Sequence, residues 1–403
     1  MLKVFQINTE ATGLSTGRIT EGIGNAVLTH GWESYITYGR RTGDSKSHMH
    51  AIGSKKDFYL HALDSRLFGR SGYASKSATV KLLNYLKEVK PDIIQLHNLH
   101  GYYLNLEILF NYLNYVNTPL VWAFHDLWPI TGHCTQFENV GCKKWKTNCH
   151  HCPQLNEYPK SLFFDNSKHS HKLKKSLFTK RSQLQIVTSS KWSKDQIKES
   201  YFSRYPIEVI PNGINIEVFN PKKSETKRYE LNLKGKQIIL GVAGVWNNKK
   251  GLHDFIQLSE LISEEQVIVL IGLSATQINQ LPKQIIGIER TSNIEELAIY
   301  YSMAHVFLNL TYADTFPTTN LEALACGTPI VSYDTGGSVE SIFKETGKIV
   351  AKGDLVGILK AIKDLNQKPA EYYTLKCTQI AKEHYNMVTQ FDKYRKIYEQ
   401  LLN

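Results

Sequence analysis

Short apolar stretches with the length of buried strands alternate with helical patterns along this chain, and no other feature constrains its fold as strongly. Strands that alternate with helices are typical of a parallel sheet covered by helices. The first series of expected strands is residues 3–7, 35–38, 91–97, 120–125 and 185–189. Helical patterns lie at 77–90 and 191–201. The alternation predicts an α/β fold.

The alternation restarts in the second half of the chain, which indicates a second unit of the same kind. A strand from Glu208 to Ile214 ends in a Pro-Asn-Gly turn, and a connector follows to about Pro221. Two doubly wound units joined there would leave a cleft between the carboxyl edges of their sheets, where such folds bind ligands. Further strands are expected at 237–242, 266–271, 306–309 and 329–333, and further helices at 251–261, 295–302 and 319–326.

These patterns also predict the domain boundaries. We expect an N-terminal domain at 1–207, a hinge at 208–222 and a C-terminal domain at 223–375. A last helical stretch at about 371–401 is long enough to cross back onto the first domain, and we expect a C-terminal helix at 376–403 to pack there.

The charge balance favours partners that carry negative charge. The chain has 48 lysines and arginines against 37 acids, a net charge of +11. Nucleotide phosphates, anionic lipid and nucleic acid all fit this balance. The densest basic stretch, 168–181, is either a solvated helix face or a contact with an anionic membrane surface. No apolar run reaches the roughly 18 residues of a membrane span and the first residues do not resemble a signal peptide, so we expect a cytosolic protein.

Two acids stand out in the segment 313–337, which has the pattern of a loop, a short helix and a buried strand. Glu322 together with Thr319 fits a capping box, in which the acid bonds back to the first backbone N–H of the helix. That interpretation needs no ligand, but it leaves Asp314 and the pair at 336–337 unexplained. In the alternative, one acid accepts the hydroxyls of a ribose and the other those of a sugar.

The spacing Asp314-x7-Glu322, with Gly336-Gly337 after the next strand, resembles the E-x7-E signature of family 4 glycosyltransferases. Members have the GT-B fold, two Rossmann-like domains that face each other across a cleft. The resemblance implies that Glu322 binds the donor's ribose and that Asp314 contacts its sugar. Phe316 and Pro317, also expected at the donor, complete an Asp-x-Phe-Pro pattern that resembles the branch acting in bacterial exopolysaccharide and capsule synthesis.

A second motif, Gly244-x5-Lys250-Gly251, resembles the family's Gly-Arg-x4-Lys-Gly phosphate loop. A lysine just before a helix suits a diphosphate, because its point charge adds to the positive end of the helix. The family's arginine falls at Val245 here, so that contact is missing or comes from Lys249. Taken alone, the motif also fits an ordinary turn before a helix.

Glycines follow the first strand in Gly13-Leu-Ser-Thr-Gly17-Arg18, which resembles the family's N-terminal glycine loop. Such a loop lets backbone N–H groups approach a pyrophosphate. We expect a loop from Glu10 to Arg18 and a helix after it to about His30. Without the other motifs, a structural turn is the simpler interpretation.

Three histidines lie at expected strand ends. His125 follows the strand at 120–124 and resembles the family's cleft histidine, which lies beside the reacting centre of the donor sugar. His97 and His100 resemble a segment of the exopolysaccharide branch, and we expect them on the acceptor side. A single histidine at a sheet edge can also simply anchor a loop.

Four cysteines, Cys134, Cys142, Cys149 and Cys152, crowd into one loop that we place at 126–160. Four soft ligands suit tetrahedral zinc, and with no position left for water the site would be structural. Disulfides or free thiols are the alternatives.

Together, the resemblance implies a retaining glycosyltransferase with a UDP- or GDP-sugar as donor. Its acceptor would be a saccharide, lipid-linked, in exopolysaccharide, capsule or lipopolysaccharide assembly at the inner face of the membrane. Catalysis would need no metal, because Lys250 takes the place of the cation, and nucleic acid is not an expected partner. Two other hypotheses stay open: a nucleic-acid-binding zinc protein, and a GT-B epimerase or phosphorylase.

Overall fold

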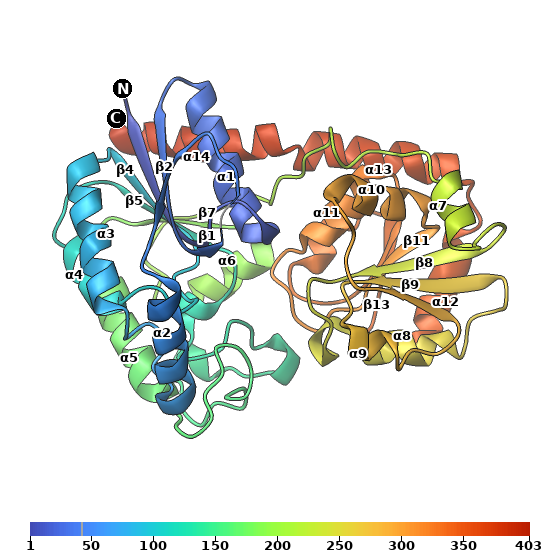
Figure 1. Cartoon of the computed structure of the whole chain (residues 1–403), viewed down its shortest axis with the longest axis horizontal. Coiled ribbons are helices and arrows are strands. Elements are labelled where there is room, and N and C mark those ends of the chain that lie inside the picture. Colours follow the sequence, from blue (N-terminus) through green and yellow to red (C-terminus); the bar gives the residue numbers. More distant parts are fainter. Residues whose placement is uncertain (42) are drawn as a thin grey trace. The chain divides into compact units, whose positions relative to one another are not determined.

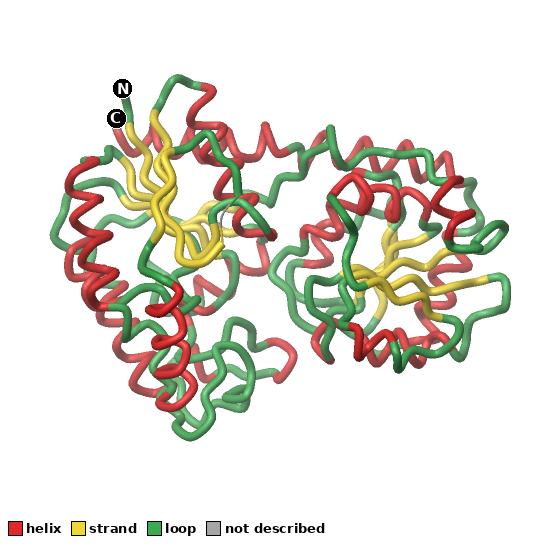
Figure 2. Tube along the Cα trace, in the orientation of Figure 1, coloured by secondary structure: helices red, strands yellow, loops and turns green. Residues whose placement is uncertain are grey.

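The computed structural model describes residues 1–41 and 43–403, without the side chains of Leu14 and Arg41. The chain divides into two compact units, each built around one sheet with helices on both sides (Figures 1 and 2). Unit 1 comprises Met1–Pro211 and Val388–Asn403, and unit 2 comprises Asn212–Met387. The described residues include no helix with both the length and the hydropathy of a membrane span.

Unit 1 contains a parallel sheet in the order β3-β2-β1-β4-β5-β6-β7. Both faces of a parallel sheet are covered, which favours continuous apolar strands such as β5, with the sequence LVWAF. The strands are β1 (Lys3–Glu10), β2 (Glu33–Arg41), β3 (His48–Ala51), β4 (Ile93–Leu96), β5 (Leu120–Phe124), β6 (Gln185–Thr188) and β7 (Ile207–Val209). The helices are α1 (Leu14–Thr29), α2 (Lys55–Phe68), α3 (Lys76–Val89), α4 (Leu106–Leu113), α5 (Ser167–Phe178), α6 (Lys191–Lys198) and α14 (Met387–Leu402).

Unit 2 contains a parallel sheet in the order β10-β9-β8-β11-β12-β13. Its strands are β8 (Gln237–Val242), β9 (Gln266–Ile271), β10 (Ile285–Ile288), β11 (Val306–Asn309), β12 (Ile330–Tyr333) and β13 (Gly347–Val350). Its helices are α7 (Glu225–Glu230), α8 (Leu252–Ser259), α9 (Ala275–Ile278), α10 (Ile294–Met303), α11 (Thr318–Ala325), α12 (Leu355–Leu365) and α13 (Ala370–Tyr385). The predicted α/β fold with parallel sheets is confirmed in both units.

The C-terminal stretch was predicted as one helix, which is wrong, because it forms two. Asn386 leaves the helical conformation between α13 and α14, with φ −59° and ψ 121°. There the Ile214 N–H donates to the Tyr385 carbonyl and the Ile214 carbonyl accepts from the Met387 N–H, at 2.7 and 3.0 Å. The backbone of Ile214 thus takes up hydrogen bonds that a continuous helix would make itself.

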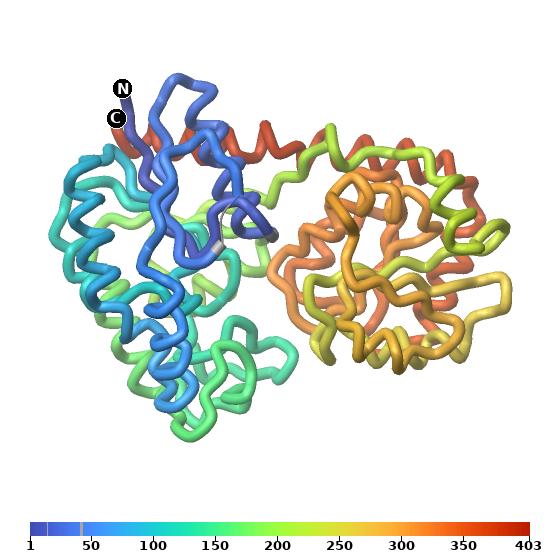
Figure 3. Tube along the Cα trace, in the orientation of Figure 1, coloured from blue at the N-terminus to red at the C-terminus, as the bar shows by residue number. Residues whose placement is uncertain are grey.

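The last helix, α14, packs on the N-terminal elements of unit 1. Figure 3 shows the C-terminal segment beside the N-terminal segment of the chain. The Tyr398 hydroxyl donates to Gln95 Oε1 of β4 at 2.9 Å, and Phe391 packs against Gly22 of α1. A buried glutamine in a core strand therefore serves to anchor α14.

Candidate active site

The residues predicted for the site fall into two groups, one in each unit. In unit 2, Lys250 and Asp314 come from the loops that follow β8 and β11, which are neighbouring strands. The Lys250 ammonium donates to an Asp314 carboxylate oxygen at 2.7 Å. The two side chains are 37% and 18% exposed, so the pair can be reached by a ligand. The fold thus brings together a cation and an acid that lie 64 residues apart in the chain.

The glycine of the lysine motif lets the two loops pack closely. Gly251 has a left-handed backbone with φ 72°, and a Cβ atom there would lie 2.3 Å from the Leu310 carbonyl oxygen. The Tyr312 N–H also donates to the Lys249 carbonyl at 2.8 Å. The lysine loop is therefore fixed on the loop that carries Asp314, with the start of α8 directly after it.

Glu322 does not form the capping box that the sequence permitted. Pro317, with an extended backbone, precedes α11, so the helix begins at Thr318 and no side chain caps it. Thr319 lies inside the first turn and is not the cap residue. Glu322 is 2% exposed and accepts a hydrogen bond from the Tyr301 hydroxyl of α10 at 2.9 Å. Its carboxylate is held between α10 and α11.

Phe316 packs inside unit 2. Its ring lies 5.9 Å from that of Tyr385, and its carbonyl accepts from the Asn212 side chain at 3.0 Å. The Asp314 carbonyl accepts from the Gly337 N–H at 3.3 Å, so the glycine pair after β12 supports the acidic loop. Where the family carries an arginine, Val245 is 70% exposed.

The N-terminal glycine segment is shorter than predicted. Helix α1 begins at Leu14 with Gly13 as its cap residue, so Gly17 lies in the first turn and not in a loop. A Cβ atom on Gly17 would lie 2.8 Å from the Thr12 carbonyl oxygen, whereas the space around Gly13 is open. No acid lies in the first turn of α1 and no side chain caps it. This leaves a helix N-terminus of the kind that binds anions.

Two of the predicted histidines are in contact at the carboxyl ends of β4 and β5. His97 Nδ1 lies 3.0 Å from His125 Nε2, and His97 Nε2 lies 3.0 Å from Gln6 Oε1. The Gln6 amide nitrogen donates to the Thr20 carbonyl at 3.1 Å, which turns its oxygen towards His97. His97 therefore donates from Nε2 and accepts at Nδ1, and His125 donates from Nε2.

Burial keeps both imidazoles neutral. It lowers the pKa of His125 to about 4, and it lowers the pKa of His97 well below its ordinary value. With its proton on Nε2, the neutral His125 has its lone pair on Nδ1. The chain Gln6–His97–His125 thus fixes one tautomer of the histidine that the family resemblance placed at the reacting centre.

The third histidine contacts an acid that the sequence analysis did not select. His100 Nε2 lies 2.6 Å from Asp126 Oδ2, and His100 Nδ1 lies 3.0 Å from the Tyr158 hydroxyl. Asp126 Oδ1 accepts from the Trp128 N–H at 2.9 Å. Burial would raise the pKa of the Asp126 carboxyl, but His100 and these hydrogen bonds outweigh it and hold the pKa below its ordinary value. The position of Asp126, next to His125, was the signal available in the sequence.

The four cysteines of the loop line one small cavity of about 20 Å³. All are free thiols. The Cys149 sulfur accepts from the Gly132 N–H at 3.3 Å. A hydrogen bond with Cys134 lowers the pKa of the Cys152 thiol, and the same bond raises the pKa of Cys134. Across residues 1–41 and 43–403, no group of three or more His, Cys, Asp and Glu side chains is arranged to hold a metal ion. Structural zinc stays a prediction.

The basic stretch 168–181 is partly internal, which neither interpretation of it anticipated. Lys174 is 1% exposed and donates to the Trp128 and Thr131 carbonyls at 2.9 and 3.1 Å. Arg181 is also buried and donates to the backbone carbonyls of Leu113, Val116 and Thr118. These two cations stabilise loops of unit 1 and do not face solvent.

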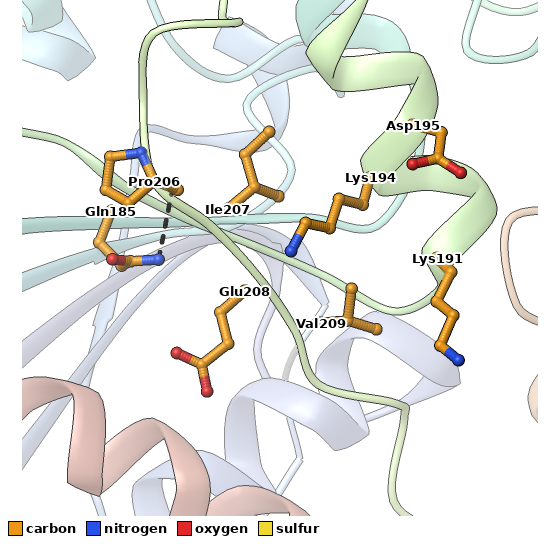
Figure 4. A pocket seen from close by; sticks show the side chains of 8 residues that line it. All are labelled: Gln185, Lys191, Lys194, Asp195, Pro206, Ile207, Glu208 and Val209. Atoms are coloured by element: carbon orange, nitrogen blue, oxygen red, sulfur yellow. Dashed lines mark hydrogen bonds between the residues drawn. The ribbon is translucent and has the colours of Figure 1, made fainter.

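An open cavity of about 590 Å³ lies in unit 1 beside the edge strand β7 (Figure 4). Lys191 and Lys194 of α6 and Glu208 of β7 border it. None of the residues predicted for the site lines this cavity. It is a groove of mixed charge that the sequence motifs do not explain.

Comparisons with known proteins match both units. Residues 30–218 match the model described as Glycosyltransferase Family 4, and residues 236–368 match that described as Glycosyl transferases group 1. The putative colanic acid biosynthesis glycosyl transferase WcaC of Escherichia coli (strain K12) is 23% identical over 391 residues, 90% of each chain. A Campylobacter jejuni relative, N,N'-diacetylbacillosaminyl-diphospho-undecaprenol alpha-1,3-N-acetylgalactosaminyltransferase, is 30% identical over 170 residues, 39% of this chain and 42% of its own.

Solved structures show the same fold. Sucrose-phosphate synthase from Thermosynechococcus elongatus superposes with a TM-score of 0.73 at 16% identity, over 100% of this chain and 99% of the other. Anabaena HepE, solved with UDP and glucose, gives a TM-score of 0.70 at 13% identity, over 99% and 100% of the two chains. The fold is that of GT-B glycosyltransferases, as predicted. With family matches across both units, this chain belongs to the family 4 glycosyltransferases.

Proposed function

We propose that the chain is a retaining glycosyltransferase that moves a sugar from a UDP- or GDP-sugar to a lipid-linked saccharide in exopolysaccharide, capsule or lipopolysaccharide synthesis. The observation that carries this proposal is the Lys250–Asp314 pair at the carboxyl edge of the unit 2 sheet. A cation beside an acid, next to a helix start, suits a ligand with a phosphate at one point and sugar hydroxyls at another.

In this proposal, Lys250 contacts the diphosphate of the donor. As the bond to the sugar breaks, negative charge grows on the leaving diphosphate, and a fixed ammonium and backbone N–H groups stabilise it. Lys249 and the first turn of α8 are the further donors proposed for this role. The reaction then needs no metal ion to balance the leaving charge.

The acids hold the sugar ends of the donor. Asp314 accepts hydroxyls of the transferred sugar, and Glu322 accepts those of the ribose. The Tyr301 hydroxyl supports the second role, because it holds the Glu322 carboxylate in one orientation. A carboxylate that is fixed before the ligand arrives loses little conformational entropy on binding.

His125 lies beside the anomeric carbon in this proposal, as a neutral imidazole. The proposal assigns no carboxylate as a nucleophile: Asp126 has the role of orienting His100, through the contact of its Oδ2 with His100 Nε2, while its Oδ1 accepts from the Trp128 N–H. Retention would then follow from return of the acceptor hydroxyl to the face that the diphosphate leaves.

The names of similar proteins support the substrate classes. WcaC is named for colanic acid biosynthesis, and the Campylobacter jejuni relative is named for a diphospho-undecaprenol acceptor. HepE was solved with UDP and with UDP-glucose, which favours UDP as the first nucleotide to test.

The test measures the melting temperature of the protein with UDP, GDP and an oligonucleotide, and then the release of nucleotide from a panel of nucleotide sugars. We expect a rise with one of the two nucleotides. The rise should shrink in Glu322→Gln, which keeps an acceptor for Tyr301 but loses the charge. It should shrink less in Tyr301→Phe, which keeps the charge but loses the hydrogen bond that orients the carboxylate. A rise with the oligonucleotide alone would favour a nucleic-acid-binding protein instead.

A further inference from the structure

Helix α2 carries a row of large apolar side chains on its outer face. Its inner face has the buried His61, Ala62 and Ser65 and the half-buried Phe58, whose ring lies 5.9 Å from that of Tyr102. Tyr59, Leu60 and Leu63 are 68%, 55% and 53% exposed. A surface helix normally presents polar residues on its outer face, so this exposed apolar row indicates that something covers the outer face in the working protein.

A neighbouring loop extends the same surface. Phe163 and Phe164 are 72% and 57% exposed, and Leu162 is 50% exposed. The Phe164 ring stacks on the Phe68 ring with centroids 6.0 Å apart, and the Leu162 N–H donates to the Arg66 carbonyl at 2.7 Å. The outer face of α2 and residues 162–164 therefore form one apolar surface, called here the α2 surface.

Basic side chains lie within and around the α2 surface. Lys55, Lys56 and Arg66 are exposed and lie three or four residues from Tyr59, Leu60 and Leu63, the spacing of one helix face. Arg70 lies over the Phe68 ring at 5.2 Å.

Two acids in residues 55–70, Asp57 and Asp64, stand against four basic residues, Lys55, Lys56, Arg66 and Arg70. Asp57 bonds to Ser54 at the start of α2, and Asp64 pairs with Arg70 at 3.9 Å. Asp165 accepts from the Cys152 and Ser167 N–H groups, and Glu157 lies in the loop before residue 160. The outer face keeps an excess of positive charge.

We propose that the α2 surface rests on an anionic lipid bilayer, with the apolar side chains in the headgroup region and the basic ones against lipid phosphates. This inference rests on the proposed function in one respect, because a lipid-linked acceptor would be reached at a bilayer. The combination of exposed aromatic and leucine side chains with lysine and arginine is the one that binds such surfaces. A second copy of the chain fits less well, because a two-fold contact would place the same basic residues opposite each other.

The test is co-sedimentation with vesicles of phosphatidylcholine alone or mixed equally with phosphatidylglycerol. We expect binding to the mixed vesicles that weakens with added salt. The double variant Leu60→Ser/Phe163→Ser should lower the partition constant about tenfold or more, because both side chains would lose burial in the bilayer. The matched control is Leu375→Ser/Tyr229→Ser, at side chains of unit 2 that are 70% and 79% exposed, and it should bind like the unchanged protein.

Equal binding by both double variants would overturn the proposal, as would a dimer in lipid-free solution that only Leu60→Ser/Phe163→Ser abolishes. Sedimentation uses no donor, so it tests membrane binding by the α2 surface separately from donor binding by the proposed active site. Failed vesicle binding with an intact nucleotide-induced rise in melting temperature rejects the α2 surface alone. Vesicle binding without any nucleotide effect rejects the donor assignment alone.

Discussion

His97 Nδ1 accepts a hydrogen bond from His125 Nε2 over 3.0 Å, and this contact leaves the basic lone pair of His125 on its other ring nitrogen, Nδ1. His97 can accept only because its other nitrogen donates to Gln6, whose amide is oriented by the Thr20 carbonyl. Gln6 of β1, His97 directly after β4 and the Thr20 carbonyl of α1 therefore fix the tautomer of the His125 imidazole.

The first prediction concerns the hydrogen bonds that link Gln6, His97 and His125. His97→Phe should lower kcat about ten- to a hundredfold. The Nε2–H group of His125 would lose its acceptor at a cost of about 1–3 kcal/mol, and the proton of His125 would no longer be confined to Nε2. The nucleotide-induced rise in melting temperature should stay. His97→Asn is the control, since its side-chain oxygen can take the place of Nδ1, and it should retain most activity. Equal loss in both variants would contradict the argument.

The second prediction concerns pH and stability. His61 Nε2 accepts from the Gly72 N–H at 3.0 Å, and burial lowers the pKa of His61 to about 4. A proton on Nε2 would remove that acceptor, so the unfolded chain, with a pKa near 6.5, binds the proton more readily. The stability from His61 is complete above about pH 6.5 and is lost as the pH falls towards 4.

His97 and His125 act in the same direction, so unfolding by urea should become easier across this window. His61→Gln keeps an acceptor for Gly72 but cannot titrate. It should therefore lower the pH dependence of the free energy of unfolding, measured from pH 7 to pH 4. An unchanged slope would show that His61 is not neutral in the folded protein.

The third prediction concerns the donor cation. Lys250→Met should lower kcat/KM by about a hundredfold, because a charged contact to the leaving diphosphate is lost and Asp314 is left unpaired beside it. The variant is compared with Lys344→Met, the same loss of charge at an exposed position of unit 2. A loss no larger than that of Lys344→Met would remove Lys250 from the mechanism.

Much of the fold could be predicted from the sequence, because buried parallel strands are continuous apolar runs that stand out locally. Helix α2 escaped prediction for a physical reason: Tyr59, Leu60 and Leu63 lie on its outer face, so its apolar residues do not follow the pattern of a core helix. The break at Asn386 escaped as well, since it depends on hydrogen bonds with Ile214, far away in the chain.

The candidate site divides in the same way. Lys250, Asp314 and His125 lie in motifs at strand ends, where topology alone brings side chains together. Gln6 and Tyr158 belong to no motif, and only the packing of distant segments gives them partners. Glu322 shows the limit of local reasoning. The local sequence fits a capping box, but Pro317 precedes the helix without a side-chain cap, and Glu322 accepts instead from the Tyr301 hydroxyl of α10.

The last prediction concerns the cysteine loop. Between β5 and α5, the described chain has only three single turns of 3-10 helix, at Trp128–Ile130, Glu138–Val140 and Lys144–Lys146. A loop of this length with so little hydrogen-bonded structure gains stability from a metal cross-link, and its four thiols share one cavity. Protein purified without chelator should contain one zinc per chain by elemental analysis. Cys149→Ser should lose it, whereas Cys377→Ala, which removes a thiol from unit 2, should not. If the unchanged protein carries no zinc, the thiols fill the cavity by themselves and the loop is stabilised by packing alone, through side chains such as Trp145, which is 2% exposed.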